Sequence, residues 1–114
     1  DRVFLVSPSS TEQRVRSAAT LSRGFAYAVS TMGITGTRDE VDSNAKSVVA
    51  AIRTQAPEQF AAVGIGISTA EQAAEVTDYA DAAIVGSSFI RAYQEGGIAT
   101  LRQKVLQIVA GLKR

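Results

Sequence analysis

Residues 60–68 read Phe60-Ala61-Ala62-Val63-Gly64-Ile65-Gly66-Ile67-Ser68, an apolar run that ends in two spaced glycines and a hydroxyl side chain. A run this short and this apolar predicts a strand of a buried parallel sheet, from Phe60 to Val63. Glycine lets backbone N–H groups approach an anion, and a helix that starts just afterwards directs its positive end at the same point. The stretch therefore predicts a strand, an anion-binding loop and a helix in succession.

The same succession is repeated along the chain. Further strands are expected at Val3–Val6, Phe25–Val29 and Ala82–Val85. Strands separated by helical segments indicate right-handed crossovers and a parallel α/β sheet. The expected helices are Thr11–Leu21, a helix from Asp42 or Ser43 to Gln55, one opening at Ser68 and ending near Tyr79, a short extra helix at Ser88–Glu95, and Thr100–Leu112 after a hinge at Gly96-Gly97.

Caps and apolar spacing define the helix starts and the inward faces. Ser9 or Ser10 is expected to cap the first helix, and Ser68 with Glu71 to form a capping box for the third. The Val3–Val6 run has no polar face, so this strand is expected to be buried on both sides. The expected inward residues are Val15, Ala18 and Ala19; Ala45, Val48, Val49 and Ile52; Ala70, Ala73, Ala74 and Thr77; and Leu101, Val105, Ile108, Val109 and Leu112.

The length, charge and composition of the chain exclude several classes of catalytic and metal site. The 114 residues fit one domain and fall short of the ~200–250 that a complete β/α barrel needs. The absence of His excludes Ser-His-Asp catalysis, a His general base and His-ligated metals, and no metal site is expected. A net charge of +1 suggests neither a nucleic-acid nor a membrane partner. The absence of Cys is compatible with the reducing cytoplasm, which is the expected location.

Three loops follow the last three expected strands and could share one phosphate. They are Thr31-Met32-Gly33-Ile34-Thr35-Gly36-Thr37-Arg38, Gly64–Ser68 and Gly86-Ser87-Ser88. In a β/α barrel such loops converge at one face. Gly33 and Gly36 could equally serve only as turn residues, whereas Gly66 and Gly86 each lie between a strand and a helix. Neither a complete G-x-G-x-x-G pattern nor a G-K-[ST] motif is present, which disfavours nucleotide sites.

These residues together resemble one family, the tryptophan synthase alpha subunits. The resemblance rests on residues 25–30, Gly33–Gly36, residues 64–73, Ala80-Asp81 and residues 84–87, and the opening residues 3–10 resemble the family's fifth strand and its loop. It implies a (β/α)8 TIM barrel, of which this chain is the C-terminal half. Residues 1–114 would then form a single domain of four βα units, from the fifth strand to the eighth helix, with an extra short helix after the last strand.

The resemblance also implies a function for the intact protein. The family is a lyase that cleaves indole-3-glycerol phosphate to indole and glyceraldehyde 3-phosphate, by a retro-aldol step in tryptophan biosynthesis. Its partner, the beta subunit, holds pyridoxal phosphate, so no cofactor is expected in this chain. The implied phosphate ligands are Gly36, Gly66, Gly86 and Ser87. Tyr27, Ile65 and Ile84 would line the indole pocket, with Ile65 in place of the usual Phe, and Thr35 would help to close the site.

The chemistry is expected to lie elsewhere. The family's acid/base carboxylates come from its second and third strands, so no catalytic residue is expected in this chain and the isolated chain should be inactive. Asp39 and Glu40 are expected to be solvated loop residues. Because the chain starts at Asp1 without Met, a fragment, a processed chain or an engineered piece is expected.

Two alternatives stay open, and one association is expected. The first alternative is a standalone or engineered half-barrel that binds phosphate or sulfate without catalysis. A distant second is another phosphate-binding barrel, such as an isomerase or a phosphoribosyl enzyme. Open sheet edges and an apolar inner face predict that the chain by itself pairs with a second copy.

Overall fold

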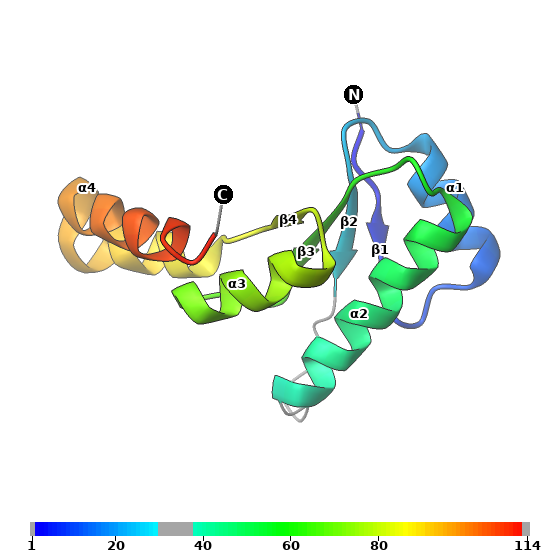
Figure 1. Cartoon of the computed structure of the whole chain (residues 1–114). Coiled ribbons are helices and arrows are strands. Elements are labelled where there is room, and N and C mark those ends of the chain that lie inside the picture. The colour runs from blue at the N-terminus through cyan, green and yellow to red at the C-terminus, as the bar shows by residue number, and fades with distance from the viewer. Residues whose placement is uncertain (1, 30–37, 113–114) are drawn as a thin grey trace.

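The computed structural model describes residues 2–29 and 38–112, with the backbone alone described for residues 38–42. Strand and helix alternate four times along the chain, as the sequence predicts (Figure 1). The elements are β1 (Leu5–Val6), α1 (Glu12–Leu21), β2 (Ala26–Val29), α2 (Arg38–Gln55), β3 (Ala61–Gly64), α3 (Ala70–Tyr79), β4 (Ala82–Ala83) and α4 (Ser87–Val109).

The four strands form one parallel sheet in chain order, β1-β2-β3-β4. Leu5, Tyr27, Ala62 and Ala82 are consecutive partners across the sheet, and the next row is Val6, Ala28, Val63 and Ala83. Because side chains alternate between faces along a strand, these two rows point to opposite sides. The ladder pairs of β1 and β4 are shorter than the predicted strands, and most residues of both runs are exposed or half-buried, because these two strands form the edges of the sheet.

The helix-facing side of the sheet holds the core. Its alanines at Ala26, Ala28 and Ala61 are completely buried, which lets the helices lie close to the strands. The predicted inward stripe of α2 is confirmed, because all four residues are buried. In α3 the sequence missed Val76, which is 1% exposed, while Ala74 and Thr77 are only half-buried. The largest completely buried side chains are Ile52, Ile67, Val6, Val63 and Val76.

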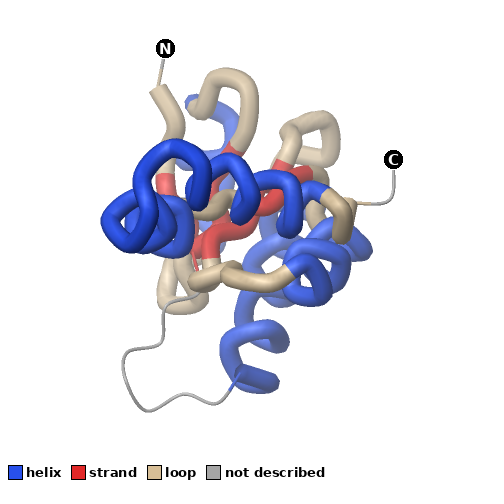
Figure 2. The backbone as a smooth tube through the Cα atoms, turned by 90° about the vertical axis from the view of Figure 1, so that its left-hand side faces the viewer, coloured by secondary structure: helices blue, strands red, loops and turns tan. Residues whose placement is uncertain are grey.

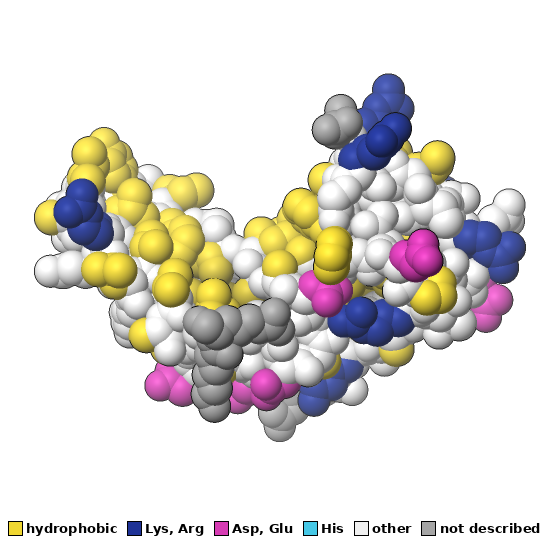
Figure 3. Space-filling view, turned by 45° about the horizontal axis from the view of Figure 1, so that its top comes forward, with side chains coloured by type: hydrophobic (Ala, Val, Ile, Leu, Met, Phe, Trp, Pro, Cys, Tyr) yellow, Lys and Arg dark blue, Asp and Glu magenta, His cyan; other side chains and the backbone are white. Residues whose placement is uncertain are grey.

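The opposite side of the sheet, here called the inner face, is uncovered. Leu5 is 64% exposed and Phe60 is 62% exposed, while Val6, next to Leu5, is 1% exposed. The prediction that Val3–Val6 is buried on both sides is therefore wrong in this chain, because the alternation along β1 sends Leu5 to a face that no described element covers. Figure 3 shows hydrophobic side chains along a hollow between two raised ends of the molecule.

The last helix turns back on itself at a glycine. Gly97 has φ +73° and ψ −157°, a non-helical conformation that divides α4 into two arms, so the predicted hinge is confirmed. Figure 2 shows α4 nearest the viewer, with the strands behind. The predicted stripe of the second arm is only partly buried, with Ile108 at 3% and Val109 at 49% exposed. Just after α4, Gly111 lies so close to the Ala70 backbone that a Cβ there would clash with it.

Helix starts differ from the predictions by one to five residues. Thr11, and not Ser9 or Ser10, caps α1 by accepting a hydrogen bond from Arg14 N (3.2 Å). Thr69, and not Ser68, caps α3. In both cases the hydroxyl directly before the first helical residue makes the cap, because only this position reaches the N–H three residues on.

The second helix begins well before its apolar stripe. α2 starts at Arg38 and not at Asp42 or Ser43, so residues 39 and 40 belong to a helix and not to a loop. The first buried residue of its stripe is Ala45, and for that reason apolar spacing could not detect the polar first turns.

Candidate functional site

The candidate site lies at the carboxyl ends of β3 and β4. Loops that follow adjacent parallel strands emerge at the same edge of a sheet. A groove of about 400 Å³ runs between them, lined by Ser68 and Thr69 before α3 and by Ser88 and Arg91 of the first arm of α4. The second arm contributes Thr100, Gln103, Lys104 and Gln107. Ser68 and Ser88 bring the second and third predicted phosphate loops to this groove, while the predicted ligands Gly66, Gly86 and Ser87 are not among the residues that line it.

The loop after β3 is anchored on both sides of its central glycine. Ile65 is 5% exposed and Ile67 is 2% exposed, while Gly66 between them is exposed to solvent. Gly66 has φ +75°, and a Cβ built there would meet no atom within 4 Å. Glycine is therefore needed at this position for its conformation and not for lack of space. The two buried isoleucines hold the loop so that Gly66 faces outward.

A network at the start of α3 fixes the end of this loop. Gln72 Oε1 accepts hydrogen bonds from Ser68 N (2.8 Å) and Ser68 Oγ (3.3 Å). Gln72 N in turn donates to Thr69 Oγ1 (3.1 Å). This is a capping arrangement displaced by one residue, because the side-chain acceptor reaches the N–H before the cap and not that of the cap itself. The predicted partner of Ser68 was Glu71, so the sequence placed the box one residue too early.

Donors remain available at the start of α4. Gly86 is the residue before the helix and makes no side-chain cap, while its carbonyl accepts from Phe89 N (3.0 Å) and Ile90 N (3.1 Å). Within residues 2–29 and 38–112, no hydrogen bond uses the Gly66 N–H or the Ser87 hydroxyl. Such free donors beside a helix N-terminus suit an anion.

The groove also contains two cations that the sequence analysis does not single out. Arg91 and Lys104 belong to opposite arms of α4, and both line the groove together with Glu95. In the part of the chain that the structure describes, none of the three forms an ion pair. The turn at Gly97 places both arms of α4 along the same groove. Their spacing gives no signal in the sequence, although the Gly96-Gly97 pair indicates that the arms could fold back.

The residues predicted for the indole pocket lie in different parts of the structure. Tyr27 lies on the inner face with its ring over Gly64, where a Cβ would stand 2.7 Å from Tyr27 Cε1. Ile84 lines a groove of about 430 Å³ on the same face, with Phe25, Phe60 and Ala62. Ile65 instead belongs to the buried core cluster. Thr35 and Gly36, predicted for loop closure and phosphate, lie outside the described residues, as does Gly33.

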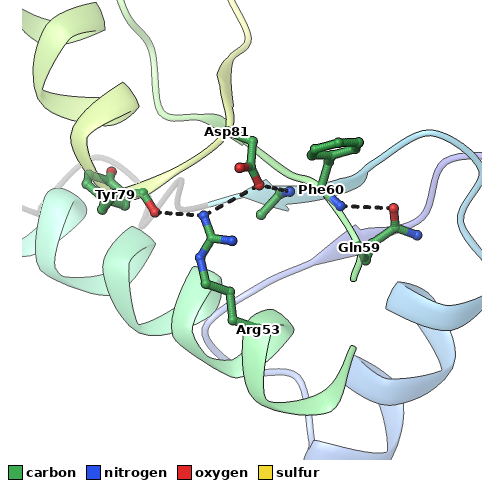
Figure 4. Close-up of polar contacts among 6 residues, drawn as sticks. Arg53, Gln59, Phe60, Tyr79 and Asp81 are labelled. Carbon is green, nitrogen blue, oxygen red and sulfur yellow. Dashed lines mark hydrogen bonds and ion pairs between the residues drawn. The ribbon is translucent and has the colours of Figure 1, made fainter. Parts of the chain in front are cut away.

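Among the described residues, the carboxylate with the most polar contacts lies away from the groove. Asp81 Oδ2 accepts from Ala61 N (2.8 Å) and pairs with Arg53 Nη2 (3.4 Å), which also donates to the Tyr79 carbonyl (3.3 Å) (Figure 4). Asp81 precedes β4 and Ala61 begins β3, so this cluster, here called the Asp81 cluster, lies at the amino-terminal ends of the strands. It ties α2 to the sheet and is not part of the candidate site.

The described side chains offer no metal site. Those of residues 2–29 and 43–112 include no group of three or more Asp or Glu placed to hold a metal ion. Among these residues there is also no helix with the length and apolar character of a membrane span.

Comparisons with known proteins agree on one family. The family model "Tryptophan synthase alpha chain" matches residues 1–113. The tryptophan synthase alpha chain of Leifsonia xyli subsp. xyli is 53% identical over 114 residues, and that of Mycobacterium avium is 44% identical over 114 residues. The match covers all of this chain and 43% and 42% of those relatives, so the chain spans less than half of their length.

Solved structures give the same result. A structure of Mycobacterium tuberculosis tryptophan synthase superimposes with a TM-score of 0.85 at 38% identity, covering 100% of this chain and 42% of the other. The alpha subunit from Campylobacter jejuni gives 0.78 at 26% identity, covering 93% and 42%. The four parallel βα units are therefore half of a TIM barrel of the (β/α)8 class. The chain belongs to the tryptophan synthase alpha chain family.

Proposed function

We propose that this chain supplies the phosphate-binding part of a tryptophan synthase alpha subunit, as the C-terminal half of its barrel. The observation that carries the proposal is the pairing of two loops at one edge of the sheet. The free Gly66 N–H follows β3, and the free Ser87 hydroxyl begins α4 after β4. Ser68 and Ser88, which belong to the same two loops, line a groove to which Arg91 and Lys104 add positive charge.

In this proposal the substrate is indole-3-glycerol phosphate, and its phosphate binds Gly66, Gly86 and Ser87, with Gly36 completing the site. Backbone N–H groups and the end of a helix are suited to a dianion, since the helix N-terminus carries a partial positive charge. Tyr27 and Ile84 contact the indole from the inner face, and Thr35 helps to close the site. Ile65 belongs to the same proposal, although its side chain lies in the buried core.

Retro-aldol cleavage to indole and glyceraldehyde 3-phosphate needs a general acid and a general base. In the proposal both come from the part of the family's chain that precedes these four units, and the 114 residues alone turn over no substrate. No cofactor belongs to the chain, and pyridoxal phosphate stays with a partner beta subunit. A cytoplasmic location belongs to the same proposal.

Self-association is also part of the proposal. Leu5 and Phe60 leave a large apolar area on the inner face, which a second copy of this chain could cover. If that pairing is stable without other chains, the alternative of a non-catalytic half-barrel scaffold that binds phosphate gains support.

The experiment is a phosphate titration of the 114-residue chain followed by backbone amide NMR. Gly66 and Ser87 amides should shift with inorganic phosphate, and Ser87→Ala should weaken binding about fivefold, the loss of one hydrogen bond worth ~1 kcal/mol. Gly66→Ala should weaken it further, because a side chain at φ +75° is strained.

Gly24→Ala provides a matched control. Gly24 has φ +93° and nothing within 4 Å of a built Cβ, but it lies between α1 and β2, before the strand and away from the groove. This variant should bind phosphate like the unaltered chain. Equal weakening by both alanine variants would contradict the proposed site. Turnover of indole-3-glycerol phosphate by the chain alone, above the uncatalysed rate, would contradict the proposal that the general acid and base lie outside these 114 residues.

A further inference from the structure

The hydrogen bonds at the start of α3 give Gln72 an unusual position. Its Oε1 accepts from both the N–H and the hydroxyl of Ser68, and its own N–H is held by Thr69 Oγ1. Ser68 is the second residue after Gly66, and Ile67 between them is 2% exposed. One side chain of α3 therefore fixes the end of the loop that carries the exposed glycine.

The consequence concerns which donors an anion can reach. A backbone N–H that already has an acceptor is not available to an anion. The Ser68 N–H, which precedes the cap of α3, is bound to Gln72 Oε1, while the Gly66 N–H has no partner among the described residues. Gln72 thus occupies the Ser68 N–H and holds the backbone that presents the Gly66 N–H.

We propose that Gln72 is a positioning residue for phosphate, which acts through Ser68 to hold Gly66 in its binding conformation. This inference rests on the proposed phosphate site and adds to it a residue that does not touch the ligand. Gln72 is half-buried and belongs to the first turn of α3, so its backbone is fixed by the helix. Its side chain couples the order of the loop to the order of the helix.

The test uses the 114-residue chain, inorganic phosphate and two readouts: amide hydrogen exchange at Ser68, and phosphate affinity from the Gly66 and Ser87 amides. Gln72→Ala should expose Ser68 N to exchange and weaken phosphate about fivefold, the equivalent of one lost hydrogen bond of ~1 kcal/mol. Gln72→Glu keeps an acceptor for Ser68 and should restore the slow exchange. Its added charge should keep phosphate binding weak.

Thr11→Ala separates positioning from a general loss of stability. Thr11 caps α1 as Thr69 caps α3, and its loss costs a similar ~1 kcal/mol of folding free energy, in a unit away from the groove. This variant should leave phosphate affinity unchanged. If the unaltered chain binds phosphate and Gln72→Ala binds it equally well, the positioning role is overturned and the phosphate site stands. If the unaltered chain shows no phosphate shifts, the proposed function fails and the positioning role fails with it.

Discussion

The two faces of the sheet are made from the same four strands and have opposite character. The helix-facing side carries Ala and Val side chains that are almost completely buried, such as Val6 at 1% and Val63 at 0% exposed. The inner face carries larger side chains, Leu5 and Phe60, that are more than 60% exposed. Small residues on the helix-facing side let the helices lie close to the strands, whereas Leu5 and Phe60 on the inner face can only be buried by something that arrives from outside the described residues. The comparison shows that one sheet can have a completely buried face on one side and a solvent-exposed apolar face on the other.

The largest expected loss of stability comes from the core on the helix-facing side, where Ile52 of α2 is completely buried. Ile52→Ala should lower the free energy of unfolding by ~2–5 kcal/mol, since it leaves a cavity in a packed site. Leu5→Ala should lower it by less than ~1 kcal/mol, because Leu5 is mostly exposed. Urea unfolding followed by circular dichroism measures both. Should Ile52→Ala fail to fold, Ile52→Val should still cost ~0.5–1.5 kcal/mol. Equal losses for Ile52 and Leu5 would show that the inner face is buried in solution.

The second prediction concerns self-association through the inner face. Leu5→Asp should weaken self-association about tenfold or more, because burial of a Leu side chain contributes ~1.5–3 kcal/mol. Sedimentation velocity over a range of protein concentrations measures this change. Ser47→Asp is the matched control, since it adds the same charge at an exposed position of α2. A chain that stays monomeric at every concentration, with no variant applied, would refute association through this face.

The smallest expected effect is a difference in stability between two variants of the Asp81 cluster, one at Asp81 and one at Arg53. Asp81→Ala should cost ~1–3 kcal/mol, because it leaves the buried Ala61 N–H without its acceptor. Arg53→Met should cost less than ~1 kcal/mol, since the ion pair is partly exposed and Met keeps most of the apolar stem. Chemical denaturation of the two variants side by side measures the difference. A larger loss from Arg53→Met would mean that the ion pair, and not the backbone contact, holds α2 to the sheet.

Local patterns in the sequence predicted the order of the elements, the stripe of α2 and the hinge near Gly97, because each depends on residues close together in the chain. The caps were missed by one or two residues, since several hydroxyls stood next to one another. The exposure of Leu5 could not be read from its own strand, because burial depends on what covers the face. The sequence did not identify Arg91 and Lys104 as site residues for a related reason. They line the same groove only because α4 turns back at Gly97, and the direction of that turn depends on tertiary packing.

The chain-ordered strand pairing has a consequence for how this architecture can be built. Each extensive contact between elements lies within one βα unit or between consecutive units, from α1 against α2 to α3 against α4. Stability in such an arrangement is close to a sum of units and of the interfaces between neighbours, as it is in repeat proteins. Each of the four units therefore depends mainly on its neighbours in the chain, while the uncovered inner face is common to the whole array.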